Sequence, residues 1–170
     1  MSKTRKLTEI AACIAMAVVC SFIKVWEMPQ GGSVALTMIP ILFIAQKRGP
    51  ITGIVAGSIY GALSALISGV IYHPASLFLD YILAFGALGI AGFFKNSAPK
   101  IAIGATLGIL CRFIFSLISG AVLFAEYAPD GQNPWLYSLI YQTTYMLPEL
   151  IISLTVLLFL YKKAHRVYEI

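Results

Sequence analysis

The sequence predicts an all-α integral membrane protein: a single domain over residues 1–170, with six transmembrane helices and both termini in the cytoplasm. Of the 170 residues, 59% are apolar and 11% are charged, and the mean hydropathy is +0.88. Soluble domains carry about a quarter charged residues, so this composition excludes a soluble enzyme, a nucleic-acid binder and a disordered chain. A chain of this length has room for six spans of about 20 residues joined by short loops.

Six apolar segments support that number of spans. They lie at 7–25, 34–46, 51–71, 75–94, 101–124 and 135–161. The second segment is short and contains Pro40. The first follows a basic N-terminus but lacks the small-residue cleavage site of a signal peptide, so we expect it to remain in the protein as a helix.

Basic residues gather in the segments that six spans place on one side of the membrane. These residues are Lys3, Arg5, Lys6, Lys47, Arg48, Lys95, Lys100, Lys162, Lys163 and Arg166. The loops predicted on the opposite side carry Glu27, His73, Glu126 and Asp130 instead. Lysine and arginine mark the cytoplasmic side of a membrane protein, so both termini are expected in the cytoplasm.

Two of the predicted outer loops are rich in turn-forming residues. Residues 28–33 contain Pro29 and a glycine pair, and residues 127–134 contain two prolines and a glycine. Irregular backbone at membrane depth is tolerated where it is buried in protein or lines a cavity. We therefore expect a pocket that opens outward and is roofed by both loops; the alternative is a pair of ordinary solvated connections.

Small residues recur at intervals of four in three of the spans. Gly53, Gly57 and Gly61 do so in the third span, and Gly104 and Gly108 in the fifth. Such spacing lets helix backbones approach closely in lipid, which favours packing within the chain. Ala11 and Ala15 share this interval in the first span. These alanines indicate either packing within the chain or a surface on which a helix of another subunit packs.

Ionisable side chains at membrane depth are costly and usually face a cavity. Asp80, Arg112 and Glu149 lie within predicted spans. Asp80 could balance Arg112, a cationic ligand, or both. Glu149 follows Pro148 and is interpreted as part of a helix break, whereas Glu9 is interpreted as a solvated carboxylate at a helix start.

Aromatic side chains crowd the outer half of the last span. Tyr137, Tyr141 and Tyr145 follow one another at intervals of four, so they form one stripe on a helix. With Phe124 and Gln142 nearby, this stripe suits a pocket for a flat heteroaromatic cation. The alternative is plain helix packing.

Motifs of enzymes and cofactor proteins are missing from the sequence. There is no glycine-rich phosphate loop ending in Gly-Lys-Ser/Thr, and no zinc-ligand spacing. His73 and His165 fall on opposite sides of the predicted membrane. The three cysteines lie in apolar runs, which indicates inert thiols. We expect neither enzymatic activity, nor a metal, nor a cofactor.

Several motifs together resemble one family, over nearly the whole chain. They are Met28–Val34, Met38–Ile41, His73-Pro74, Leu79–Tyr81, Arg112-Phe113, Ile118–Gly120, Tyr127–Pro129, Trp135–Leu139 and Tyr145–Pro148. The chain is similar in these motifs to the thiamine-specific substrate-binding components (S-components) of energy-coupling-factor (ECF) transporters.

The resemblance implies an S-component bundle of six helices in the plasma membrane of a prokaryote, surrounded by lipid. Such a subunit captures a small vitamin from outside and works with a transmembrane coupling subunit and two cytoplasmic ATPases. In the family, an alanine motif of the first helix docks on the coupling subunit, and this motif falls on Ala11 and Ala15.

The resemblance also implies a set of substrate-binding residues. They are Asp80, Tyr81, Arg112, Ser116, Gly120, Phe124, Tyr137, Tyr141 and Gln142. Three positions depart from the family's usual residues: Ser116 replaces His, Gln142 replaces Asn, and Ser76 replaces Gln. Because these positions are expected at the ligand, vitamin B6 or a thiamine precursor is an alternative substrate. A stand-alone proton-coupled carrier that relays protons through Asp80 or Glu149, and a structural scaffold, are further alternatives.

Overall fold

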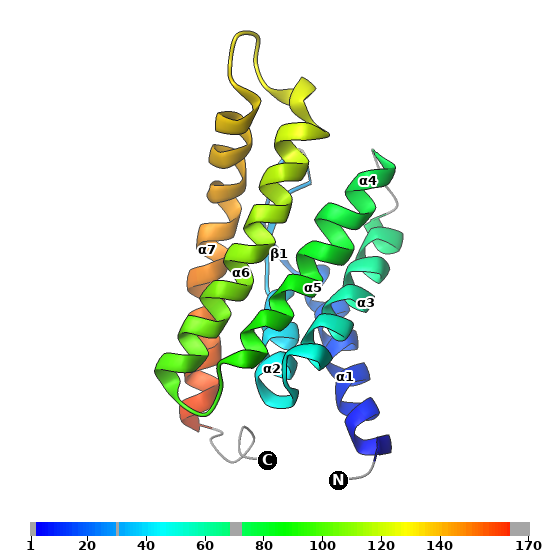
Figure 1. Ribbon diagram of the computed structural model, residues 1–170, viewed down its shortest axis with the longest axis vertical. Helices are drawn as coiled ribbons and strands as arrows, with labels where there is room; N and C mark the ends of the chain where they lie inside the picture. The colour runs from blue at the N-terminus through cyan, green and yellow to red at the C-terminus, as the bar shows by residue number, and fades with distance from the viewer. Residues whose placement is uncertain (1–2, 30, 69–72, 164–170) are drawn as a thin grey trace.

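The computed structural model of the protein describes residues 3–29, 31–68 and 73–163 and shows a bundle of helices with one small hairpin (Figure 1). The long helices run side by side along the longest axis of the molecule. The predicted end of the third span at Ile71, and the predictions for His165 and Arg166, lie outside the described residues.

The first part of the chain departs from the predicted pair of spans. Helix α1 covers Lys3–Ser21 and is followed by strand β1 at Lys24–Glu27, strand β2 at Ser33–Ala35 and helix α2 at Met38–Arg48. The strands pair antiparallel, with Trp26 opposite Val34. The all-α prediction missed this hairpin. The predicted end of the first span at residue 25 and the predicted start of the second span at residue 34 are wrong, because α1 ends at Ser21 and α2 begins at Met38.

Local chemistry explains the hairpin and the short second helix. Pro29 lacks a backbone N–H, and Gly31 has φ +92°, a left-handed conformation that favours glycine. Helix α2 has 11 residues and is therefore about 16 Å long. A hydrocarbon core is about 30 Å thick, so α2 alone does not span it.

The rest of the described chain forms four long helical segments. The elements are α3 at Pro50–Ser68, α4 at Pro74–Ser76, η1 at Leu77–Leu83, α5 at Ala84–Ala87, η2 at Leu88–Phe93, α6 at Ala98–Val122, η3 at Ala125–Tyr127 and α7 at Pro134–Lys163. Elements α4 to η2 follow one another without a break, and η1 is a π-helix. Among the described residues, the segments 50–67, 74–93, 98–122 and 134–163 are long and apolar enough to cross a membrane.

The basic segments share one end of the bundle. The start of α1, the end of α2, the connection from η2 to α6 and the end of α7 all lie at the bottom of Figure 1. The hairpin and the connection from α6 to α7 lie toward the opposite end. This arrangement agrees with the separation of basic residues that the sequence predicts.

Glu9 ties α1 to α2 at this basic end. Its carboxylate accepts hydrogen bonds from Arg48 and lies 3.5 Å from Lys47 Nζ and 3.6 Å from Arg5 Nε. The interpretation of Glu9 as a merely solvated carboxylate is therefore wrong, because the side chain joins two helices.

Glycines bring α3 against the segment 74–93, as their spacing predicts. A Cβ on Gly57 would lie 2.1 Å from the carbonyl oxygen of Phe85, and one on Gly61 would lie 2.2 Å from that of Tyr81. On α6, a Cβ on Gly104 would lie 2.8 Å from the carbonyl oxygen of Ala91. The prediction of packing within the chain is confirmed at these positions.

We expect Gly57→Val to lower the free energy of unfolding by at least about 2 kcal/mol, because overpacking against rigid backbone forces helices apart. Unfolding of the purified protein in detergent measures this change. Leu66→Val on the same helix is the control, since Leu66 is 74% exposed and should shift stability little. Equal stability of the two variants would contradict the close helix contact.

Candidate functional site

A cavity of about 900 Å³ lies between the hairpin and the helices. Its walls come from the end of α1, the hairpin, Thr37 just before α2, and the helices α3, α4, η1, α5, α6, η3 and α7. It contains every ligand-binding residue predicted from the sequence, namely Asp80, Tyr81, Arg112, Ser116, Gly120, Phe124, Tyr137, Tyr141 and Gln142. Asp80 and Gln142, which lie 62 positions apart in the chain, thus face the same cavity. Contact between these residues and a ligand stays a prediction.

Asp80 lies on the π-helix η1 and lines this cavity. Its carboxylate accepts a hydrogen bond of 2.5 Å from the hydroxyl of Ser119 on α6. Single π-helical turns in α-helices occur often at functional sites. Among the described residues, no lysine, arginine or histidine lies within ion-pair distance of Asp80. The Asp80–Arg112 pair considered from the sequence is therefore not formed.

Arg112 pairs with Glu149 instead. Arg112 Nη1 lies 3.7 Å from Glu149 Oε2, and the Arg112 Cζ lies 4.1 Å from the centroid of the Phe85 ring. Thr37 donates a hydrogen bond of 3.5 Å to the other carboxylate oxygen of Glu149. Glu149 is 2% exposed and lines the cavity. Both charged side chains are therefore held by the protein at the cavity wall.

Sequence reasoning missed Glu149 as a cavity residue because Pro148 indicated a helix break. Helix α7 runs through Pro148 without interruption. Ser138, Gln142 and Glu149 are all buried on this helix, at intervals of four and seven. A polar stripe of this period in an apolar span was the signal that could have identified Glu149.

Protein hydrogen bonds fix the orientation of Gln142. Its side-chain N–H donates to the carbonyl oxygen of Ser116 at 3.0 Å, and its carbonyl oxygen accepts from the hydroxyl of Tyr145. Gly120 packs tightly beside them, since a Cβ there would lie 2.3 Å from Ser138 Oγ. These contacts join α6 to α7 and fix the wall of the cavity.

The tyrosine stripe of α7 forms an aromatic wall, as predicted. The rings of Tyr137 and Tyr141 are stacked, with centroids 6.2 Å apart and planes at 29°. Tyr141 meets Tyr145 edge to face at 6.1 Å. All three line the cavity, so a flat ligand would find ring faces and edges there.

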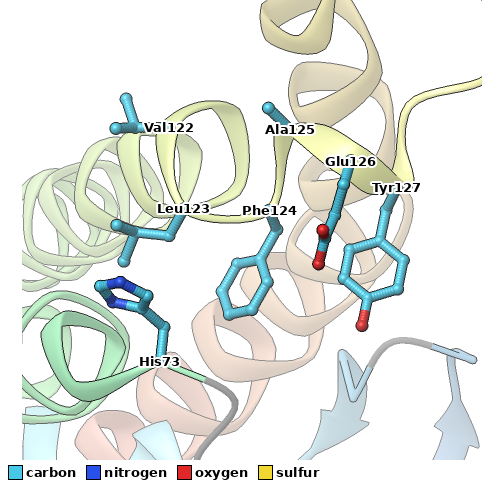
Figure 2. Close-up of a pocket in the computed structure, with 7 residues that line it drawn as sticks. All are labelled: His73, Val122, Leu123, Phe124, Ala125, Glu126 and Tyr127. Carbon is cyan, nitrogen blue, oxygen red and sulfur yellow. The ribbon is translucent and has the colours of Figure 1, made fainter.

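A second, smaller hollow of about 440 Å³ adjoins the cavity where α6 ends (Figure 2). Phe124 and Tyr127 line both spaces, and their rings lie 6.0 Å apart. The His73 side chain projects into the hollow from the start of α4, and Glu126 lies beside Tyr127. Aromatic side chains therefore continue from the cavity into this hollow.

The hairpin closes one side of the cavity. The backbone N–H of Gly32 donates to the hydroxyl of Tyr141 at 3.2 Å, and the N–H of Met28 donates to the carbonyl oxygen of Gly32 at 2.6 Å. The described residues of loop 28–33 line the cavity, as expected, while the outward opening of the cavity stays a prediction. The expectation for the other loop is wrong for residues 128–134, because Tyr127 is the part of it that lines the cavity.

No group of three or more histidine, cysteine, aspartate or glutamate residues in the described part of the chain is arranged to hold a metal ion. The groups that line the cavity are carboxylates, hydroxyls, an amide, a guanidinium, the Lys24 side chain and aromatic rings. An apolar helical bundle around such a polar, aromatic cavity is the architecture of a membrane protein that binds a small solute.

The chain belongs to the family described as "Thiamine transporter protein (Thia_YuaJ)", which matches residues 7–169. It is 39% identical over 180 residues to the thiamine transporter ThiT of Bacillus subtilis, covering 96% of this chain and 94% of that protein. It is 29% identical over 120 residues to ThiT of Lacticaseibacillus paracasei, covering 61% of this chain and 60% of that one.

Solved structures support the same fold. ThiT from Listeria monocytogenes superposes with a TM-score of 0.85 at 26% identity, covering 98% of each chain. The S component of a bacterial ECF transporter superposes with a TM-score of 0.70 at 21% identity, covering 99% of this chain and 100% of the other. The prediction of an S-component-like helical fold is confirmed.

Gly32→Ala should detach the hairpin from α7, because the added Cβ would lie 2.7 Å from the ring of Tyr145. We expect faster amide hydrogen exchange over residues 24–35, measured by mass spectrometry. Ser33→Ala is the matched control, since it also introduces an alanine into the hairpin, at the residue after Gly32. Unchanged exchange in both variants would show that Gly32 does not hold the hairpin.

Proposed function

We propose that this protein is the substrate-binding subunit of an ECF-type importer and captures thiamine from outside the cell. The observation that carries the proposal is the Asp80 carboxylate, which faces an aromatic cavity without a cationic partner among the described residues. Thiamine supplies what this site lacks, because it is a small cation built from two flat heteroaromatic rings.

Electrostatics and aromatic contact favour such a ligand. A carboxylate and a cation attract one another more strongly in a desolvated site than in water. The ring faces of Phe124, Tyr137 and Tyr141 add cation–π attraction and stacking area. Because the protein already holds these groups in place, little conformational entropy is lost when the ligand binds.

We propose the full topology of six transmembrane helices with both termini in the cytoplasm of a prokaryote. Four apolar helices and the common basic end of the bundle support it. Helix α1, and α2 together with the hairpin, would supply the remaining two crossings within surrounding lipid. The outer end of the cavity then faces the substrate, and the basic end faces the cytoplasm.

Helix α1 offers a surface for the partners of such an importer. Ala11 and Ala15 are both exposed on α1. Small side chains let another helix approach closely. We propose that a transmembrane coupling subunit docks there and that two cytoplasmic ATPases drive release, since this chain carries no phosphate-binding loop of its own.

Three cavity residues that differ from the family's usual residues support a second candidate substrate. Ser76, Ser116 and Gln142 all line the cavity, and they differ from the residues that the resemblance leads us to expect. Vitamin B6 or a thiamine precursor is therefore the alternative substrate. Calorimetric titration with thiamine and with pyridoxine separates the two proposals, because one ligand should bind clearly more tightly than the other.

Asp80→Asn should weaken thiamine binding by about 10- to 100-fold, because a hydrogen bond or ion pair to a charged group is lost while the shape of the side chain is kept. Isothermal titration of the purified protein measures the affinity. Glu126→Gln is the control, since Glu126 lies at the outer hollow and should leave the affinity unchanged. Unchanged affinity in Asp80→Asn would contradict the role of this carboxylate.

Ala15→Trp should abolish thiamine uptake without weakening thiamine binding, because a bulky side chain prevents docking of the coupling subunit. Uptake is measured in cells that make the whole transporter, and binding is measured on the purified subunit. Ile103→Trp on α6 is the control, because Ile103 is exposed on another helix. Normal uptake in Ala15→Trp would contradict docking on this surface.

A further inference from the structure

A cluster of charged side chains at the basic end of the bundle stands apart from the substrate cavity. Its members are Arg5, Glu9, Lys47 and Arg48, and none of them lines the cavity. The side chains of Lys47 and Arg48 are only 9% and 8% exposed. Buried cations are costly without an opposite charge nearby, and the carboxylate of Glu9 supplies that charge to both.

Helix α2 is a rigid support for the two cations that hold Glu9. Most of its residues are buried, and the side chain of Gln46 donates a hydrogen bond of 2.8 Å to the carbonyl oxygen of Ile101 on α6. Lys47 and Arg48 lie in the last turn of α2, where the helix dipole favours positive charge. The ion pairs of Glu9 therefore join α1 to an element that is fixed within the bundle.

Glu9 lies on the side of α1 that turns toward the bundle. Cys13 and Ala17 follow it at intervals of four, and both are buried. Because an α-helix has 3.6 residues per turn, Ala11 and Ala15 lie about 200° and about 240° around the helix from Glu9. Both alanines are exposed. The carboxylate and the two alanines thus point to opposite sides of α1, so a contact that fixes the first also orients the second.

Apolar contacts alone define the rotation of α1 weakly. The buried side chains of the helix are Cys13, Ile14 and Ala17, whereas Met16 and Val19 are equally apolar but exposed. Lipid tails are as apolar as these side chains, so no hydrophobic force selects which of them turn inward. The ion pairs between Glu9 and α2 provide a directional contact that the apolar packing lacks.

We propose that Glu9 is a positioning residue: it sets the rotation of α1 on α2 and so presents Ala11 and Ala15 to the coupling subunit. This inference rests on the proposed docking of α1 and deepens it, because it names the contact that orients the docking surface. Since Glu9 does not line the cavity, its removal should impair assembly and uptake while ligand binding is kept.

Glu9→Gln should lower thiamine uptake by cells that make the whole transporter at least about 10-fold, because the amide leaves Lys47 and Arg48 without an opposite charge. The amount of coupling subunit that co-purifies with the protein should fall by a similar factor. Isothermal titration should show that the thiamine affinity of the purified subunit changes less than about two-fold.

Arg5→Gln is the matched control within the same cluster. The Arg5 side chain is 65% exposed and lies 3.6 Å from Glu9, and exposed ion pairs of this kind contribute little. Uptake and co-purification should therefore stay within about two-fold of the wild-type values.

A charge exchange separates the ion pair from a general loss of stability. Glu9→Arg/Arg48→Glu restores opposite charges with the partners reversed, and it keeps the net charge of the basic end that directs topology. This double variant should recover at least about half of the wild-type uptake, whereas Glu9→Arg alone and Arg48→Glu alone should not. Thermal unfolding and thiamine binding show that each variant is folded.

The outcomes distinguish this inference from the proposed function. Normal uptake and co-purification in Glu9→Gln would overturn the positioning role and leave the docking surface in place. Uptake that is lost in Glu9→Gln and not recovered by the charge exchange would also overturn it, as would a loss of thiamine binding in Glu9→Gln. Normal uptake in Ala15→Trp would instead contradict the proposed docking itself, and the positioning role with it.

Discussion

The placement of charged side chains inside an apolar bundle constrains the whole structure. Asp80, Arg112 and Glu149 come from three different helical elements and face one cavity. Such groups are tolerated within a membrane protein when they face a cavity, pair with one another or bind polar partners. Here all three solutions occur together, since Ser119 binds Asp80 while Arg112 and Glu149 pair. The bundle therefore tolerates these charged side chains because they line the cavity instead of facing lipid.

The fold forms this cavity between the hairpin and the helices of the bundle. Glycines press α3 against the segment 74–93, and the short helix α2 is enclosed by its neighbours, with Met38, Ile41 and Leu42 fully buried. Because α2 begins only at Met38, the preceding residue Thr37 reaches the cavity and binds Glu149. The hairpin forms one wall of the cavity, to which it contributes Lys24, Glu27 and Met28 as well as small residues such as Gly32 and Ser33.

Much of this arrangement follows from patterns in the sequence. Long apolar runs identified the helices α3, α6 and α7, and the tyrosine spacing identified the aromatic face of α7. The hairpin was not predicted because Val25 and Trp26 continue an apolar run. Strand pairing also depends on residues elsewhere in the chain. Glu149 was not predicted to line the cavity because Pro148 was interpreted as a helix break. Helix α7 continues through Pro148, as prolines in membrane helices permit. Local patterns predict elements well, while the partners of buried polar groups depend on the tertiary fold.

A structure of the purified protein determined with thiamine present would show whether the cavity around Asp80 is the thiamine site. We predict one thiamine molecule inside the cavity, with its cationic ring against Asp80 and its rings beside the side chains of Phe124, Tyr137 and Tyr141. Thiamine located at the membrane-facing surface, with the cavity filled by solvent alone, would contradict it.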